Sequence, residues 1–237
     1  MFETGDSIQS SATINEANVY VGSNDGNLYC IDRDTGSQKW CIQTGDFVIS
    51  KPAITSEGKI VFGSGDEFVY CASADDGNII WNTKLGGSVL SDPLTSEGRV
   101  FIGCGDRKIY CLNSASGEIV WEYQTDGLMR QRPILENGIL YAFVRDTYIW
   151  YAIDASTGQL IWRGNANTDE SLFVCGDVRP VIANGKLWCI DAQNTRPAYL
   201  SLDTGELAWT STLEKVSSRG MTTNGSTVFY RRTVEGR

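Results

Sequence analysis

A short segment of this chain, Leu28–Trp40, recurs four more times with its aromatic residues and its glycine in place. The segment reads LYCIDRDTGSQKW, and each later copy also ends on a tryptophan. These five tryptophans are separated by 41, 40, 41 and 47 positions: Trp40, Trp81, Trp121, Trp162 and Trp209. Self-similarity at such a period indicates one supersecondary unit per repeat, and the units must stack to bury a common core.

Each repeat contains four short runs of β type that are separated by turn residues. In the first repeat, the alternating run Val19–Ser23 is followed by the letters NDG at 24–26, which signal a tight hairpin turn. The run NLYCID comes next, and the letters DTG at 34–36 lead into SQKWCIQ. The repeats are therefore predicted to be four-stranded antiparallel meanders that form the blades of an all-β propeller.

This interpretation makes residues 1–237 a single propeller domain with five full repeats. Their predicted bounds are 10–49, 50–90, 91–130, 131–177 and 178–217. Residues 218–237 and 1–9 are predicted to form a partial sixth blade, because Phe2–Asp6 resembles Ile42–Asp46 after the first tryptophan. The chain is then either a ring with one incomplete blade or a fragment of a longer ring. We favour the fragment, because an unpaired strand edge beside a gap promotes association.

The tryptophans and glycines of the repeats have predicted structural roles. A blade buries both faces of its sheet, and an indole covers much area at roughly 25 cal/mol per Å². The glycines are expected to adopt the left-handed turn conformation: Gly36, Gly77, Gly117, Gly158 and Gly205. Four positions before each glycine stands a polar residue that is expected to accept turn N–H groups or a neighbouring blade's indole N–H: Asp32, Ser73, Asn113, Asp154 and Ser201.

Composition excludes several classes of function. The chain has 20 Lys and Arg against 29 Asp and Glu, and this net charge of -9 argues against general nucleic-acid binding. It contains no histidine, which removes Ser-His-Asp hydrolysis and imidazole metal ligation. No apolar run is long enough for a transmembrane segment, and the N-terminal letters MFETGDSIQS do not form a signal peptide.

The cysteines are expected to be structural. Three of the seven occupy the same place in successive repeats, directly after a tyrosine: Cys30, Cys71 and Cys111. The fourth repeat has Ala152 there, so we expect a small apolar residue in a buried strand. No two cysteines are adjacent and no CxxC spacing occurs, so no metal or redox site is predicted.

The full pattern of a repeat is specific enough to indicate a family. Its consensus, (V/I)-Y-V-G-S-x-D-G-x-(L/V/I)-Y-(A/C)-(I/L)-D-x-x-T-G-x-x-x-W, resembles the PQQ-like propeller repeat and covers essentially the whole chain. Members include quinoprotein alcohol dehydrogenases, the assembly lipoprotein BamB and sensor domains linked to protein kinases. The resemblance implies seven or eight blades around a central channel, docked through tryptophans. WD-type and kelch-type repeats are disfavoured, because the GH and WD dipeptides are missing and a Gly-Gly pair occurs once.

The same resemblance raises the question of a quinone cofactor. Family enzymes that bind PQQ have a disulfide between adjacent cysteines, an Asp base, and a Ca²⁺ held by Glu and Asn. This sequence has no adjacent cysteines, and the candidate base Asp92 stands alone among the residues that begin the innermost strands. We therefore expect a BamB-like or sensor-like protein with no cofactor and no catalytic or metal site. A PQQ-dependent oxidoreductase fragment, with calcium, is the alternative.

One further pattern is a candidate for ligand binding. The residue predicted to open strand one is basic in four of six repeats: Ser11, Lys51, Asp92, Arg132, Arg179 and Arg219. In a propeller this strand lines the channel, so Lys51, Asp92 and the three arginines are the predicted rim. Clustered cations would attract a small anion or an acidic peptide. Alternatively, they pair with acids of neighbouring turns: Asp25, Asp66, Asp106 and Asp146. A calcium site at these aspartates is not expected, since separate blades hold them apart.

The predicted function is therefore non-enzymatic binding. The chain is expected to recognise a protein segment or a small anionic ligand through the channel face or a strand edge, as a scaffold or a sensor. The extended connection Gly164–Gly176 is a second place to look for function, although surface insertions are also tolerated without one. Localisation stays open, because unpaired thiols favour a reducing compartment while the family resemblance implies the periplasm or the cell exterior.

Overall fold

The computed structural model describes residues 2–147, 149–165, 180–191, 196–210, 216–223 and 227–232, and within these ranges every regular element is a β-strand. None of the described segments is a helix of the length and apolarity that crossing a membrane requires. The chain divides into two compact units, Met1–Pro133 and Ile134–Arg237, which are described separately. The all-β prediction is confirmed.

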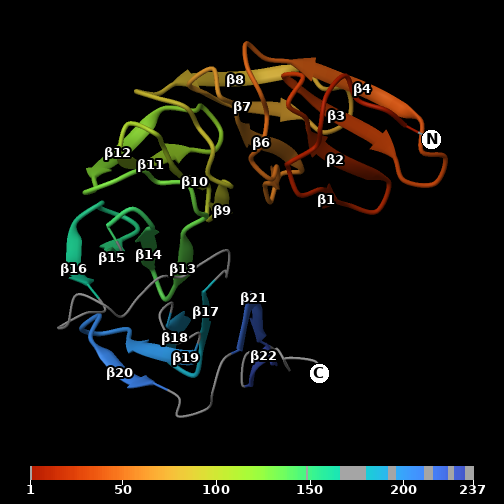
Figure 1. Cartoon of the computed structure of the whole chain (residues 1–237). Coiled ribbons are helices and arrows are strands. Elements are labelled where there is room, and N and C mark those ends of the chain that lie inside the picture. The colour runs from red at the N-terminus through yellow and green to blue at the C-terminus, as the bar shows by residue number, and fades with distance from the viewer. Residues whose placement is uncertain are drawn as a thin grey trace. The chain divides into compact units, whose positions relative to one another are not determined.

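The first unit contains three four-stranded antiparallel sheets, each with its strands in sequence order (Figure 1). The strands of the first sheet are β1 (Thr13–Ile14), β2 (Asn18–Gly22), β3 (Asn27–Asp32) and β4 (Gln38–Gln43). The second has β5 (Ala53–Ile54), β6 (Lys59–Gly63), β7 (Phe68–Ser73) and β8 (Ile79–Lys84). The third has β9 (Leu94–Ser96), β10 (Arg99–Gly103), β11 (Lys108–Asn113) and β12 (Ile119–Gln124). Each sheet is a propeller blade, as the repeats predicted.

The second unit contains two more such blades and a hairpin. The fourth blade comprises β13 (Ile134–Glu136), β14 (Ile139–Val144), β15 (Ile149–Asp154) and β16 (Leu160–Asn165). The fifth comprises β17 (Val181–Ala183), β18 (Lys186–Asp191), β19 (Arg196–Ser201) and β20 (Leu207–Thr210). Strands β21 (Val216–Thr223) and β22 (Val228–Arg232) pair with each other in the predicted partial blade.

The innermost strand of each blade is shorter than predicted. Lys51 was expected to open it, but β5 begins at Ala53, and β9, β13 and β17 also begin just after a proline. These prolines are Pro52, Pro93, Pro133 and Pro180. Proline has no N–H for a strand ladder, so pairing starts one residue beyond it. Residues 2–12 form no strand.

Every outer strand carries a β-bulge next to its tryptophan. Trp40 pairs with Cys30 while Gln38 pairs with Ile31, so Lys39 is the extra residue of β4. The same shift recurs in the other four blades. In the fifth repeat, Tyr199 pairs with Trp209. Tyr199 is thus the counterpart of Cys30 and not of Tyr29.

The core lies between successive blades within each unit. One cluster joins Tyr20, Leu28 and Cys30 of the first blade to Ile60 and Phe62 of the second. Similar clusters join the second blade to the third and, in the other unit, the fourth to the fifth. Cys30, Cys71 and Cys111 are fully buried free thiols in these strands, which confirms their predicted packing role. Burial raises the pKa of Cys71 to about 11.

Tryptophan docking follows one geometry. The Nε1–H of Trp40, Trp81 and Trp162 donates to the backbone oxygen of Ala74, Ser114 and Leu202 of the next blade, at 3.3, 3.0 and 2.7 Å respectively. The acceptor is thus the residue after the polar residue that the sequence suggested. The polar side chains bind turn N–H groups instead, as Asp32 does with Asp34 and Thr35.

The repeat glycines are needed for two separate reasons. All five have φ between +70° and +77°: Gly36, Gly77, Gly117, Gly158 and Gly205. At Gly117 a Cβ would also lie 2.6 Å from Trp81 of the preceding blade, whereas at Gly36 it would meet nothing within 4 Å. The left-handed conformation and the indole contact therefore make different demands on the same position.

Candidate binding face

The predicted rim residues lie on the connections that lead from an outer strand to the next innermost strand. In the first unit, Ser11, Lys51, Asp92 and Arg132 each stand two residues before such a strand. Ser11 and Arg132 are exposed, and Lys51 and Asp92 are half-buried. Arg179 lies outside the described residues. Arg219 lies within β21, and the structure describes its backbone alone.

Hydrogen bonds tie these connections together along the first unit. The Ser10 hydroxyl donates to the Ser50 oxygen at 3.1 Å, and the Lys51 backbone N–H donates to the Asp92 carboxylate at 2.8 Å. The Ser91 hydroxyl continues the pattern by donating to the Gln131 oxygen at 3.0 Å. In the first unit, the backbone of these connections is therefore held by neighbouring repeats.

The turn aspartates are engaged elsewhere than at the rim cations. Asp25, Asp66 and Asp106 accept hydrogen bonds from the hydroxyls of Tyr29, Tyr70 and Tyr110, at 2.8, 2.7 and 2.5 Å respectively. Burial and the nearby carboxylate raise the pKa of each tyrosine. The sequence also allowed these aspartates to pair with rim cations, but the three carboxylates bind tyrosine hydroxyls. Asp66 also accepts the Gly45 N–H at 2.7 Å, which joins it to the preceding blade.

Lys51 has no ion pair within the described part of the chain. Other lysines of that part do form ion pairs, namely Lys39, Lys59, Lys84 and Lys108. The Lys51 ammonium is therefore available to a ligand on the rim. The Asp92 carboxylate holds the backbone of Lys51, so the fold fixes the point from which this side chain extends.

The described residues include no group of three or more acidic or cysteine side chains that would hold a metal ion. One carboxylate oxygen of Asp92, the candidate base, accepts a hydrogen bond from the Lys51 backbone N–H. The sequence also contains no adjacent cysteines for the disulfide that the quinone-binding enzymes have.

The sequence did not predict a cavity in the first unit. It measures about 240 Å³ and lies between the connection before β9, the connection after β12, and the turn at Gly105. Its lining is Gly87, Ser88, Leu90, Gly105, Leu128, Met129 and Arg130. These connections continue directly into Asp92 and Arg132, so the cavity and the rim share the same segments. The sequence did contain a sign of this cavity, since the letters GGS at 86–88 replace the letters GDF at 45–47 of the first repeat.

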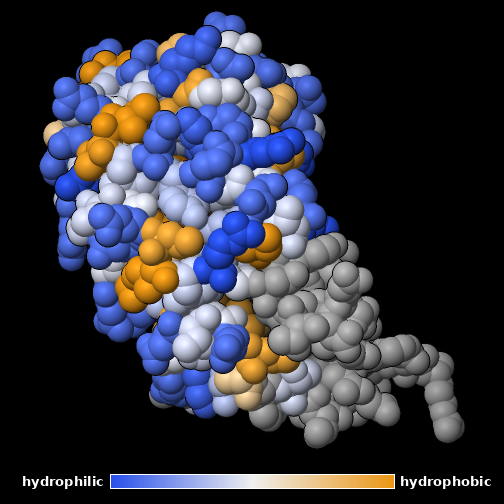
Figure 2. Space-filling model, turned by 90° about the vertical axis from the view of Figure 1, so that its left-hand side faces the viewer, coloured by the Kyte–Doolittle hydropathy of each residue, from blue (hydrophilic) through white to orange (hydrophobic). Residues whose placement is uncertain are grey.

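Apolar side chains are exposed on the outer strands. They form pairs just before the tryptophan: Ile79 and Ile80, Ile119 and Val120, Leu160 and Ile161. Figure 2 shows exposed apolar side chains in small groups separated by polar residues. The bulge explains the pairing, because an extra residue leaves two successive side chains outside the sheet contacts. The groups are small and typical of a protein surface.

Solved structures share this fold. BamB from Moraxella catarrhalis has a TM-score of 0.73 and 18% sequence identity, with 93% of this chain and 69% of that chain covered. A computationally designed protein has a TM-score of 0.72 and 14% identity, covering 93% and 67%. Quinohemoprotein alcohol dehydrogenase from Pseudomonas putida has a TM-score of 0.70 and 13% identity, covering 89% and 42%. At these identities the likeness is one of fold.

The sequence itself was compared with curated proteins and with family models. No curated protein matches it. One family model, described as outer membrane protein assembly factor BamB, matches residues 49–107 and 96–236. That match spans more than half of the chain and agrees with the repeat pattern and the blades. The chain therefore belongs to this BamB-type family of PQQ-like β-propeller repeats.

Proposed function

We propose that this chain is a non-enzymatic binding scaffold that recognises an acidic protein segment on the rim formed by the strand-one openings. The observation that carries the proposal is Lys51, whose backbone is held by Asp92 and whose ammonium has no ion pair among the described residues. The family supports it, because its model is described as an assembly factor, a role carried out by contacts between proteins.

Charge explains why the rim would select an acidic ligand. The chain as a whole carries a net charge of -9, so most of its surface repels acidic peptides. Such a peptide would then bind at a local cluster of cations, because there its attraction to the surface exceeds its repulsion. A small anion is the second ligand class, and it would use the same cations.

The test is binding of hexaglutamate to the intact chain, measured by isothermal titration calorimetry at low and high salt. Replacing Lys51 and Arg132, both on connections of the first unit, with Glu should abolish binding and leave folding unchanged. A control with the same charge change is the pair Arg33→Glu and Lys84→Glu, both exposed and away from the rim. Loss of binding in both pairs would reflect net charge alone, and unchanged binding in the rim pair would refute the proposal.

A further inference from the structure

We infer that the cavity beside Gly105 binds an aromatic side chain of a partner protein, with an acidic neighbour of that side chain paired to Arg130. The inference deepens the proposed function and rests on it, because it names a second contact that a bound protein segment would make. It is argued from a comparison between two equivalent places in the first unit.

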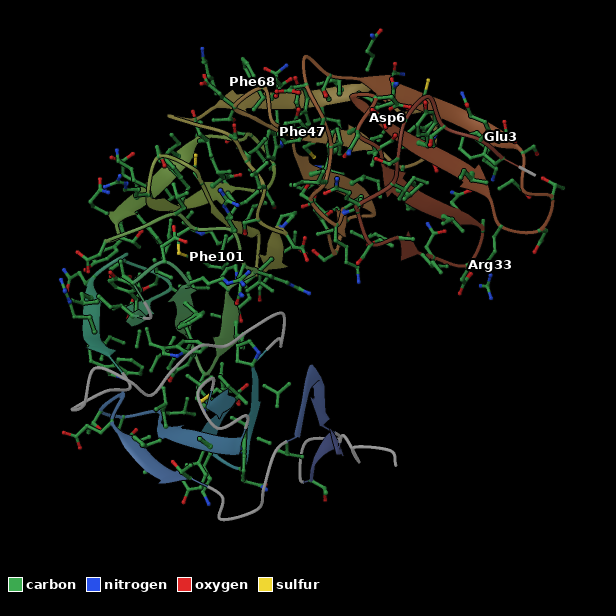
Figure 3. All side chains as sticks on the ribbon, in the orientation of Figure 1. Glu3, Asp6, Arg33, Phe47, Phe68 and Phe101 are labelled. Atoms are coloured by element: carbon green, nitrogen blue, oxygen red, sulfur yellow. The ribbon has the colours of Figure 1, made fainter. Side chains whose placement is uncertain are left out.

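The two places are the turns at Gly65 and Gly105, which occupy the same position in the second and third blades. The Gly65 N–H donates to the Phe47 oxygen, and the Gly105 N–H donates to the Ser88 oxygen, both at 2.9 Å. Phe47 and Ser88 are thus equivalent residues of successive connections. Phe47 lies on the connection between β4 and β5 (Figure 3).

The side chains differ although the backbones match. A Cβ placed on Gly65 would meet the Phe47 ring at 2.9 Å and the Asp46 carboxylate at 3.0 Å. A Cβ placed on Gly105 would find as its nearest atoms the backbone of Ser88 and Gly87, the closest at 3.1 Å. The ring and the carboxylate of one junction are therefore missing from the other, where the cavity is found. At the Gly65 turn, the protein thus packs an aromatic ring at the place equivalent to the cavity.

The walls and volume of the cavity suit such a ring. Leu90, Leu128 and the fully buried Met129 provide apolar contact, and a thioether adds favourable contact with an aromatic edge. A volume of about 240 Å³ exceeds the roughly 150 Å³ that is enough for benzene in an apolar cavity. The Ser88 hydroxyl does not take the place of such a ring, since it donates to the Gly65 oxygen at 3.1 Å.

Arg130 gives the site a charge preference. It is exposed, lines the cavity, and has no ion pair within the part of the chain that the structure describes. A guanidinium at this place can stack on the bound ring and pair with a carboxylate beside it. An extended segment that carries a Phe next to an Asp or Glu therefore matches the cavity and its edge.

The experiment uses the methionine methyl groups as reporters. The chain has three methionines, Met1, Met129 and Met221, so ¹³C-methyl labelling gives few signals, and Met129→Leu identifies the relevant one. The probe is the peptide Gly-Phe-Asp-Gly with blocked ends. We expect a saturable ring-current shift of the Met129 methyl, with a dissociation constant on the order of 1 mM for so small a contact. The same peptide with Ala for Phe should cause none.

Ser88→Phe is the decisive variant, because it supplies the ring from within, as Phe47 does. It should weaken binding at least about 10-fold, as expected when the pocket for an anchor residue is blocked. Ser7→Phe is the matched control, since Ser7 is the equivalent residue of the first connection and is exposed. No shift at Met129 in the wild-type chain, or an equal shift in folded Ser88→Phe, would overturn the inference.

A second variant keeps the test decisive if Ser88→Phe does not fold. Arg130→Glu should weaken binding of the Asp-containing peptide by about 2- to 5-fold more than binding of an Asn-containing peptide, the range of an exposed ion pair. Equal effects on both peptides would contradict the role of Arg130. Because none of these variants changes Lys51, Arg132 or Arg179, failure at the cavity and failure of hexaglutamate binding at the rim are separate results.

Discussion

At the residue scale, the fold depends on short polar contacts within turns. The Asp32 carboxylate accepts the N–H groups of Asp34 and Thr35 and binds the Thr35 hydroxyl. The Thr35 hydrogen bonds and Lys39 lower the pKa of Asp32 to about 2. In the third blade Asn113 takes the same place and accepts two turn N–H groups without a charge. The turn geometry therefore needs the oxygen acceptor, while the charge adds a dependence on pH.

Asp32→Asn should fold and should lose part of the acid sensitivity of the protein. The pKa of Asp32 is lower in the folded state than its ordinary 3.8. Ionised Asp32 therefore stabilises the fold above that value, and this contribution disappears as pH falls through about 2. The free energy of unfolding, measured in urea from pH 5 to pH 2, should fall less steeply for Asp32→Asn than for the wild type. Asp34→Asn serves as the control, and parallel curves for Asp32→Asn and the wild type would contradict the prediction.

At the element scale, blades are held together by an indole on one sheet and a glycine turn on the next. Trp81 of β8 binds the Ser114 oxygen and covers Gly117, and Trp40 does the same with Ala74 and Gly77. The bulge in each outer strand is what directs the tryptophan toward the neighbouring blade. At Gly77 and Gly117, one residue therefore serves both the packing between blades and the backbone conformation of its turn.

A pair of glycine substitutions separates these two demands. Gly36→Ala should lower the free energy of unfolding by about 1–2 kcal/mol, the cost of a left-handed conformation for an L-residue. Gly117→Ala should lose about 1–3 kcal/mol more, because its Cβ would also collide with Trp81. Urea unfolding followed by tryptophan fluorescence measures both. Equal losses in the two variants would mean that the indole moves aside without cost.

At the scale of the whole molecule, each of the two compact units contains several blades, and their connections and turns form its surface. The rim and the cavity use the same connections of the first unit, so a bound segment would contact cations and an apolar pocket in sequence. Protein interfaces commonly combine an aromatic anchor with surrounding polar contacts. The proposed scaffold role therefore needs no catalytic group.

The oxidoreductase alternative predicts a different result for the whole chain. Adding PQQ and Ca²⁺ should then produce a bound chromophore and dye reduction that depends on an alcohol or a sugar. We expect neither, because the sequence contains no adjacent cysteines for the disulfide of the quinone-binding enzymes. Absorbance after gel filtration, followed by a dye-reduction assay, decides the matter, and a retained chromophore with turnover would establish the enzyme.

The repeat determined most of the fold from sequence alone. Five aromatic landmarks, the turn letters and the β-type runs were enough for the number of sheets and their strand order, because each repeat is a local unit whose strands pair with near neighbours. The left-handed glycines and the buried cysteines followed from the same alignment of repeats. Local rules succeed here because almost every contact within a blade lies within about 40 residues of chain.

Contacts between blades were decided only by the tertiary structure. The indole acceptor proved to be a backbone oxygen beside the predicted side chain, and the turn aspartates bound tyrosines instead of rim cations. The cavity at Gly105 likewise depends on a ring that one junction has and the next lacks. Sequence determines the pattern of each blade because that pattern is local. Which atoms meet across a junction depends on how two separately folded sheets pack, and only the folded molecule specifies that.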